Sequence, residues 1–217
     1  MRHVVWDWNG TLFDDQHLVV DGLNAVLDDA DMPRVDLETY QRLYTRPVHL
    51  FYERVFGRPI DDREWARIDQ VFHEGYRAAM ARAGLAGDAE GALEALDEAG
   101  WSQSLLSMYP HEHLVPLVSQ LGIAERFARI DGLRGDGGGI KAPHLERHLA
   151  ELTRHPAAHT DDVVVVGDAL DDAAAAQQVG VACVLYDGGA HARGHLEETG
   201  VPVASTLTEA LVLAGFR

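Results

Sequence analysis

The sequence has very few cysteines and no long apolar run. Cys183 is the only cysteine among 217 residues, so no disulfide can form within the chain, and we interpret it as a small core residue. No stretch approaches about 18 consecutive apolar residues, which argues against a membrane-spanning helix. The amino terminus shows no basic segment followed by an apolar one, so we expect no secretion signal and a cytoplasmic protein.

Positive charge is also scarce. Lys and Arg total 18 against 35 Asp and Glu, which gives a formal net charge of −17. This balance opposes a broad nucleic-acid surface, because phosphate contacts need clustered cations. Lys141 is the only lysine, and arginine supplies every other basic side chain. A lone lysine in that background marks a place that needs a compact ammonium, unless it is an ordinary surface residue.

Strand-like and helix-like patterns alternate after residue 100. Apolar strands are expected at 2–7, 102–107, 127–131, 162–166, 181–186 and 201–204, and helices separate those after residue 100. Continuous apolar strands alternating with helices predict a parallel sheet covered by helices on both faces. Only helical patterns follow the first strand, at 16–31, 37–45, 48–56 and 62–83. We therefore predict an α/β, Rossmann-like core of residues 1–14 and 88–217 with an inserted α-helical cap domain, residues 15–87.

Three predicted strands end on polar side chains: Asp7, Ser107 and Asp168. Ligands of open parallel sheets bind at the carboxyl ends of the strands, so these side chains are expected to meet. Asp7 opens the segment DWNGT, in which Thr11 offers its hydroxyl and backbone N–H to an anion. Asp168 is the first aspartate of GDALDD, residues 167–172, and Asp172 lies one helical turn further on; such oxygen ligands suit Mg²⁺.

Each segment also has an ordinary structural interpretation. An N-G pair is common in turns that leave a strand, and Asp or Ser before a helix often acts as its cap. Lys141, just before Pro143, would by itself be interpreted as a surface residue. Only the order and spacing of all four elements are specific.

Together, DWNGT, Ser107, Lys141 and GDALDD resemble the haloacid dehalogenase-like hydrolase superfamily, in particular its phosphoglycolate-phosphatase-like members, over nearly the whole chain. The helical insertion resembles the small cap of that family. The resemblance implies that Asp7 is a nucleophile that forms an aspartyl-phosphate. It also implies a Mg²⁺ site made by Asp7, the backbone carbonyl of Asn9, Asp168 and Asp172, and phosphoryl contacts from Thr11, Ser107 and Lys141.

Asn9 departs from the family pattern. Family phosphatases usually carry a second Asp here, which protonates the leaving group and activates water; losing such a group typically costs about 10²–10⁴ in rate. The family's dehalogenases carry an aromatic residue here and use no Mg²⁺, whereas GDALDD favours a metal. Its phosphonate hydrolases use a cap lysine, and residues 15–87 contain none. Three explanations remain open: a substrate with a good leaving group, another acid, or a protein that binds its ligand and turns it over poorly.

Four residues are candidates for substrate specificity or for the missing acid. Arg46, His49 and Tyr52 recur at helical spacing and are expected to share one face of a cap helix. His111 follows Pro110, and a histidine has a suitable pKa for proton transfer. The alternative is that all four are solvated or packed structural residues. The histidines show no HExxH spacing, which argues against zinc.

The sequence therefore predicts a Mg²⁺-dependent hydrolase of a small phosphorylated metabolite, with no nucleic-acid or membrane partner. The alternative is a non-catalytic or weakly catalytic phosphometabolite-binding protein on the same fold. A third, weaker interpretation is a protein-interaction module that retains a relic pocket. The sequence carries no signal for the substrate's identity or for the oligomeric state.

Overall fold

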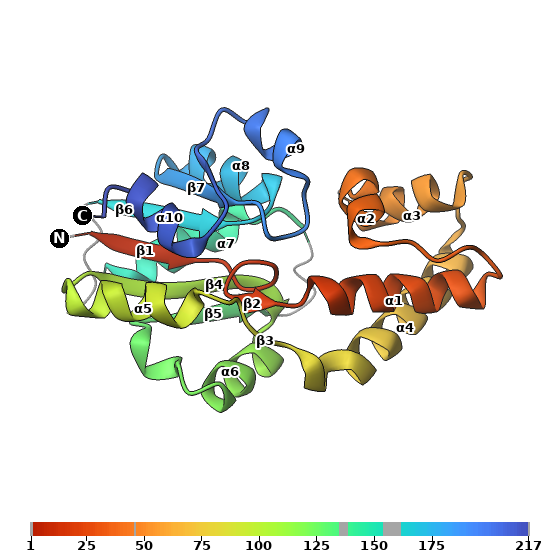
Figure 1. Ribbon diagram of the computed structural model, residues 1–217, viewed down its shortest axis with the longest axis horizontal. Helices are drawn as coiled ribbons and strands as arrows, with labels where there is room; N and C mark the ends of the chain where they lie inside the picture. Colours follow the sequence, from red (N-terminus) through yellow and green to blue (C-terminus); the bar gives the residue numbers. More distant parts are fainter. Residues whose placement is uncertain (1, 46, 135–138, 154–161, 217) are drawn as a thin grey trace. The chain divides into compact units, whose positions relative to one another are not determined.

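The computed structural model describes residues 2–45, 47–134, 139–153 and 162–216. Within them, a six-stranded sheet has the order β5-β4-β1-β6-β7-β8, and every neighbouring pair is parallel (Figure 1). The strands are β1 His3–Trp6, β4 Ser102–Pro110, β5 Ile130–Leu133, β6 Val163–Gly167, β7 Ala182–Tyr186 and β8 Val203–Ala204. The two central strands β1 and β6 are almost wholly apolar and buried, as expected for a sheet covered on both faces.

Helices cover both faces of this sheet (Figure 1). They are α5 Ala89–Glu98, α6 His111–Gln120, α7 Ala142–Leu152, α8 Leu170–Val179, α9 Arg193–Glu197 and α10 Leu207–Leu213. On one face, α7 and α8 contact each other and share an apolar cluster with the sheet, to which Val5, Leu106 and Leu145 contribute. On the other face, α5 contacts α10. The predicted α/β fold with a parallel sheet is therefore confirmed.

The helical segment after the first motif forms a second compact unit, residues 15–83 with 190–192. Its helices are α1 Gln16–Asp29, α2 Leu37–Leu43, α3 Val48–Phe56 and α4 Asp62–Ala79. The carboxylate of Asp61 accepts a hydrogen bond from the Glu64 N–H at 2.8 Å, which defines the start of α4. An aromatic-rich core holds the helices together, with Tyr40, Phe51 and Tyr52 almost fully buried.

The boundaries of the two units differ from the predicted ones at two places: residues 190–192, predicted in the core, group with the helical unit, and residues 84–87 group with the first unit. Residues 84–87 were expected in the cap, but β3 Gly84–Leu85 pairs antiparallel with β2 Phe13–Asp14, so they belong to the unit that carries the large sheet. Strands of two residues carry no periodicity, which is why the sequence did not reveal them. The remaining shifts are small: β5 begins at Ile130, and α9 is shorter than the predicted 191–199.

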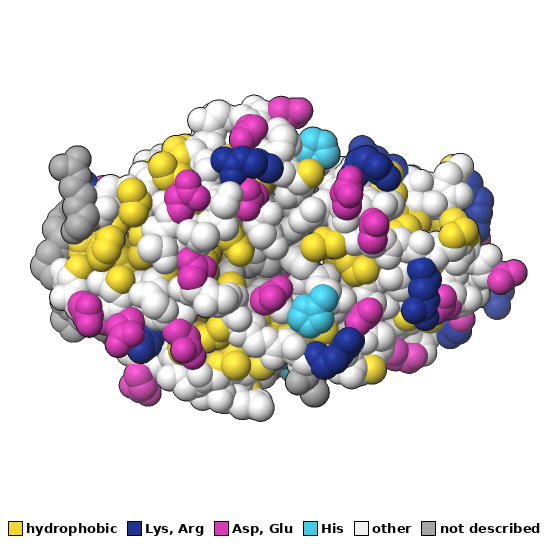
Figure 2. Space-filling model, viewed as in Figure 1, with side chains coloured by type: hydrophobic (Ala, Val, Ile, Leu, Met, Phe, Trp, Pro, Cys, Tyr) yellow, Lys and Arg dark blue, Asp and Glu magenta, His cyan; other side chains and the backbone are white. Residues whose placement is uncertain are grey.

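The described helices include none with the length and apolar character that crossing a bilayer requires. On the face drawn in Figure 2, acidic and basic side chains are interspersed. Several exposed arginines of the described residues pair with carboxylates, as in Arg58 with Glu64 and Arg67 with Asp29.

Candidate active site

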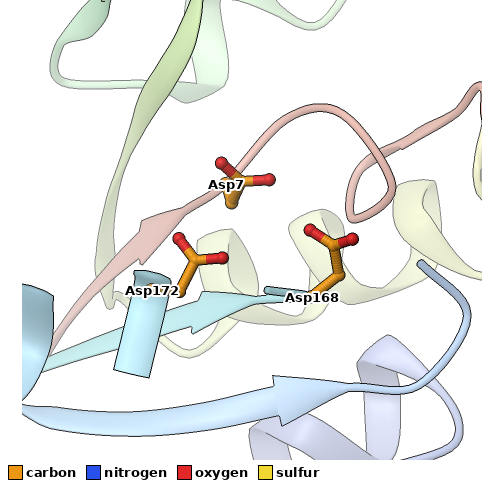
Figure 3. A group of neighbouring side chains, drawn as sticks. All are labelled: Asp7, Asp168 and Asp172. Atoms are coloured by element: carbon orange, nitrogen blue, oxygen red, sulfur yellow. The ribbon is translucent and has the colours of Figure 1, made fainter. Parts of the chain in front are cut away.

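Three neighbouring strands bring the predicted residues to one edge of the sheet. Asp7 follows β1, Ser107 lies near the end of β4, and Asp168 follows β6. Oxygen atoms of Asp7, Asp168 and Asp172 all lie within 4.8 Å of one another, and all three residues are buried (Figure 3). The structure thus gathers carboxylates that are far apart in the sequence into one group.

Asp172 belongs to this group because α8 starts directly after Asp168. Its Oδ2 accepts a hydrogen bond from the Ala169 N–H at 3.0 Å, which closes the first turn of the helix. Its Oδ1 accepts one from the ammonium of Lys141 at 2.5 Å. Asp172 therefore both caps α8 and holds Lys141, so the structural and functional interpretations of this aspartate apply together.

Lys141 lies at the start of α7 and is 4% exposed, so it is not a surface lysine. Its ammonium contacts Asp7 as well as Asp172. Burial opposes the charge of Lys141, but the carboxylates of Asp172 and Asp7 outweigh it and raise the lysine pKa. Burial also raises the pKa of Asp7 to about 7, against the opposing charge of Lys141. The site therefore holds its one ammonium firmly charged beside a carboxylate that is hard to ionise without added positive charge.

Thr11 and Ser107 supply hydroxyl groups to the same edge. The fully buried Thr11 Oγ1 lies 3.3 Å from Asp7 Oδ2 and 3.4 Å from Asp168 Oδ1. Ser107 Oγ accepts the Tyr109 N–H at 2.9 Å and donates to Asn9 Oδ1 at 3.4 Å. Thr11 thus contacts two of the three carboxylates, and Ser107 contacts Asn9, which lies two residues after Asp7.

The charge and the donor types of this group suit a divalent metal ion. Three carboxylates face one ammonium, so two negative charges are left over when all three are ionised. Oxygen donors are the ligands that Mg²⁺ prefers, and a buried excess of negative charge is costly unless it binds a cation. The residues present therefore fit Mg²⁺.

Sequence reasoning missed Gly189, which follows β7 at the same edge. A Cβ atom at this position would lie 2.0 Å from Asp168 Oδ2, so only glycine leaves room for the carboxylate. A cavity of about 190 Å³ also opens here beside Thr11; its lining residues are Gly10, Thr11, Asp14, Ala86, Gly87, Tyr186 and Gly188. The segment YDGG, 186–189, directly after an apolar strand, was the signal that could have revealed this loop.

The candidate residues of the cap have different surroundings. Arg46 falls outside the described residues. His49 is exposed on α3, whereas Tyr52 is 3% exposed and packs against Phe51 and Trp65 inside the helical unit. The alternative interpretation, a packed structural residue, therefore applies to Tyr52, because its ring is part of the aromatic core of the helical unit.

His111 lies at the start of α6, with both ring nitrogens near donors. Its Nδ1 accepts the Gly132 N–H at 3.1 Å, and a guanidinium nitrogen of Arg134 lies 2.5 Å from its Nε2. Burial and the charge of Arg134 lower the pKa of His111. The ring is therefore held neutral near pH 7, which leaves it poorly suited to donate a proton.

The comparisons with known proteins agree with this geometry. The family model for haloacid dehalogenase-like hydrolases matches residues 1–180. The chain is 26% identical over 192 residues to a phosphoglycolate phosphatase from Mesorhizobium japonicum, covering 86% of this chain and 82% of that protein. It is 26% identical over 188 residues to a phosphoglycolate phosphatase from Yersinia pseudotuberculosis, covering 85% and 80%.

A solved structure shows the same fold at lower identity. A haloacid dehalogenase-like family hydrolase from Streptococcus pneumoniae superposes with a TM-score of 0.81 at 18% identity, covering 99% of this chain and 98% of that one. The protein is thus an α/β protein with a group of buried carboxylates at one edge of its parallel sheet. The chain belongs to the haloacid dehalogenase-like hydrolase family. The family and the enzyme class predicted from the four motifs are thereby confirmed.

Proposed function

We propose that the protein is a Mg²⁺-dependent phosphatase of a small phosphorylated metabolite and that it works through an aspartyl-phosphate on Asp7. One observation carries this proposal: the carboxylate of Asp7 contacts the only lysine and lies within 4.8 Å of oxygen atoms of Asp168 and Asp172. A nucleophile, a fixed cation and a set of metal ligands thus share one buried edge. The similarity to two phosphoglycolate phosphatases supports a phosphoric monoester as substrate.

Asp7, Asp168 and Asp172, with the backbone carbonyl of Asn9, would hold the metal ion. When bound, Mg²⁺ neutralises negative charge on the phosphoryl oxygens. Lys141 supplies the second positive charge and keeps one Asp7 oxygen in place, while Thr11 and Ser107 orient the phosphoryl group with their hydroxyls. Such preorganised charge is the main requirement when a carboxylate attacks a phosphate dianion.

The reaction has two displacements. An oxygen of Asp7 attacks phosphorus, the bond from phosphorus to the leaving oxygen breaks, and the leaving group departs with the electron pair. Water then attacks the same phosphorus, the bond to the Asp7 oxygen breaks, and inorganic phosphate leaves. The first step needs a proton at the leaving oxygen unless the leaving group has a low pKa, and the second step releases a proton from the attacking water. The amide of Asn9 neither gives nor accepts these protons, so the proton of the water passes to solvent. The proposed substrates therefore have leaving groups of low pKa, such as acyl or aryl phosphates.

Turnover assays with matched variants test the proposal. Purified protein is incubated with Mg²⁺ and acetyl phosphate, p-nitrophenyl phosphate or phosphoglycolate, and released phosphate is measured. We expect Asp7→Asn and Asp172→Asn to abolish turnover. Asp171→Asn is the matched control, because this neighbouring aspartate of α8 is not part of the carboxylate group. Binding of these compounds without turnover would instead identify a phosphometabolite-binding protein.

Asn9→Asp tests the role of the substituted position. If the amide limits proton transfer, this variant hydrolyses alkyl phosphates faster by about 10²–10⁴, the usual contribution of a general acid–base group. Acyl phosphates should gain only through the second step, the attack of water on the aspartyl-phosphate, because their leaving groups need little protonation. Equal rates for the wild type and the variant on alkyl phosphates would mean that another group already acts as the acid.

A further inference from the structure

A chain of buried polar side chains crosses the apolar core between the sheet and α7. His3 on β1, Ser104 on β4 and His148 on α7 are all fully buried. Both rings reach the same hydroxyl: Nε2 of His3 lies 2.7 Å and Nε2 of His148 lies 2.8 Å from Ser104 Oγ. At the outer ends, His3 Nδ1 lies 2.7 Å from Ser102 Oγ, and His148 Nδ1 lies 2.7 Å from Asp131 Oδ2.

The donors and acceptors of this chain can be satisfied in one consistent order. Burial alone would raise the pKa of Asp131, but the hydrogen bonds from His148 and Arg129 outweigh it and lower the pKa to about 2. Asp131 is therefore ionised and accepts hydrogen bonds. The Nδ1–H of His148 then donates to Asp131, and Nε2 accepts from the hydroxyl of Ser104. Ser104 in turn accepts from the Nε2–H of His3. With both rings neutral, every polar atom between Ser102 and Asp131 has a partner.

Ser104, His148 and Asp131 have the connectivity of a nucleophilic triad, but they do not form a second active site. Ser104 has no exposed surface, and His3 occupies the other side of its hydroxyl. A substrate therefore cannot reach this oxygen. Its role must lie in the structure that it holds together.

Three of the elements joined by the chain carry or adjoin a residue of the proposed active site. β1 leads to Asp7, β4 to Ser107, and α7 begins after Lys141. His148 lies about two helical turns, or about 10 Å, along α7 from Lys141. Ser104 lies about 10 Å along β4 from Ser107, since a strand rises about 3.3 Å per residue. The polar chain thus connects the three elements at a similar depth below the catalytic edge.

We propose that His148 is a positioning residue that fixes α7 on the sheet through Ser104 and so sets the place of the Lys141 ammonium between Asp7 and Asp172. The apolar side chains beside it, such as Leu145, make non-directional contacts that tolerate small sliding of the helix. The two hydrogen bonds of His148 do not tolerate such sliding, because a displaced imidazole in a core without water would lose its partners. This inference rests on the proposed function only for the catalytic role of Lys141. The position of the Lys141 ammonium does not depend on that function.

The single lysine makes a direct test possible. Protein labelled with ¹³C at the lysine Cε gives one side-chain NMR signal, which reports the surroundings of Lys141 in the folded state whether or not the protein turns over substrate. Ser104→Ala removes the hydroxyl between the two rings. Ser102→Ala is its matched control: it lies on the same strand and its hydroxyl contacts His3, whereas the hydroxyl of Ser104 contacts the rings of both His3 and His148.

We expect Ser104→Ala to move the lysine signal toward its position in an exposed lysine and Ser102→Ala to leave it in place. Where the protein is active on acetyl phosphate, kcat in Ser104→Ala should fall at least about tenfold with KM little changed, because misplacement of a catalytic group by about 1 Å is enough for such a loss. If Ser104→Ala does not fold, His148→Leu, which keeps the ring's volume approximately, replaces it. An unmoved signal, or an equal shift in both serine variants, overturns the inference.

The two proposals fail separately. If the lysine signal moves as expected but the protein shows no turnover, the positioning role is supported and the phosphatase activity is refuted. If turnover depends on Asp7 but the lysine signal stays in place in Ser104→Ala, the phosphatase activity is supported and the positioning role is refuted. Leu211→Ala, a cavity variant in α10 on the other face of the sheet, controls for loss of stability alone and should leave the lysine signal unchanged.

Discussion

Replacing Lys141 with methionine is the perturbation whose outcome follows most directly from the structure. The side chain is 4% exposed and its ammonium contacts the carboxylates of Asp7 and Asp172. Removing one partner from a buried ion pair typically costs about 3–5 kcal/mol of folding free energy. Here we expect about 3 kcal/mol, the lower end, because Asp7 already has a pKa of about 7 and can take up a proton.

The loss should depend on pH in a defined direction. Without the ammonium, the folded pKa of Asp7 lies further above the ordinary value of 3.8. The folded state then binds more protons than the unfolded state, so the stability of the variant increases as the pH falls. Urea unfolding in EDTA should therefore show a larger difference from the wild type at pH 8 than at pH 6.

A surface control separates this effect from simple loss of charge. Arg58→Met removes a cation paired with Glu64, but that pair is exposed and should matter far less. Added Mg²⁺ should restore part of the stability lost in Lys141→Met, because it supplies positive charge to the same carboxylates. A loss below about 1 kcal/mol at pH 8, the range of exposed pairs, would refute the reasoning, as would a loss that grows toward pH 6.

Two further substitutions test separate parts of the structure. Gly189→Ala places a Cβ 2.0 Å from the Asp168 carboxylate, so the Mg²⁺ concentration needed for half-maximal activity should rise at least about tenfold, as for other changes around metal ligands; Gly91→Ala, which meets no atom within 4 Å, should leave it unchanged. Tyr76→Phe removes a hydroxyl that donates to Asp15 at 2.7 Å inside the helical unit, which should cost about 1–3 kcal/mol in urea unfolding. Unchanged stability in that variant would show that Asp15 finds another donor.

The site could be predicted from the sequence because polar residues stand at or near the ends of apolar strands. Asp7 and Asp168 each follow a buried strand, and Ser107 lies in the last part of β4, which continues past the predicted end at Ser107 to Pro110. Parallel strands place their carboxyl ends at one edge. Lys141 was detectable because it is the only lysine. These features depend on local patterns and on composition, which one chain displays directly.

The features that escaped depend on contacts between distant segments. Tyr52 has helical spacing to His49, but periodicity alone does not tell a packed aromatic from one on an open face. His3 and Ser104 are polar residues in buried strands and carried a visible signal, yet their partner His148 lies on a helix far along the chain. Only the fold shows that one serine hydroxyl lies between the two rings.

The most direct test of the account is to trap the covalent intermediate. Wild-type protein is mixed with Mg²⁺ and acetyl phosphate, quenched in acid after a few turnovers, and digested for mass spectrometry. Because Asn9 cannot activate water, we predict that a phosphoryl group accumulates on the peptide that contains Asp7 and that borohydride reduction converts this residue to homoserine. Phosphate release with no phosphoryl group on that peptide at any time point, or with the group on another residue, would contradict the account.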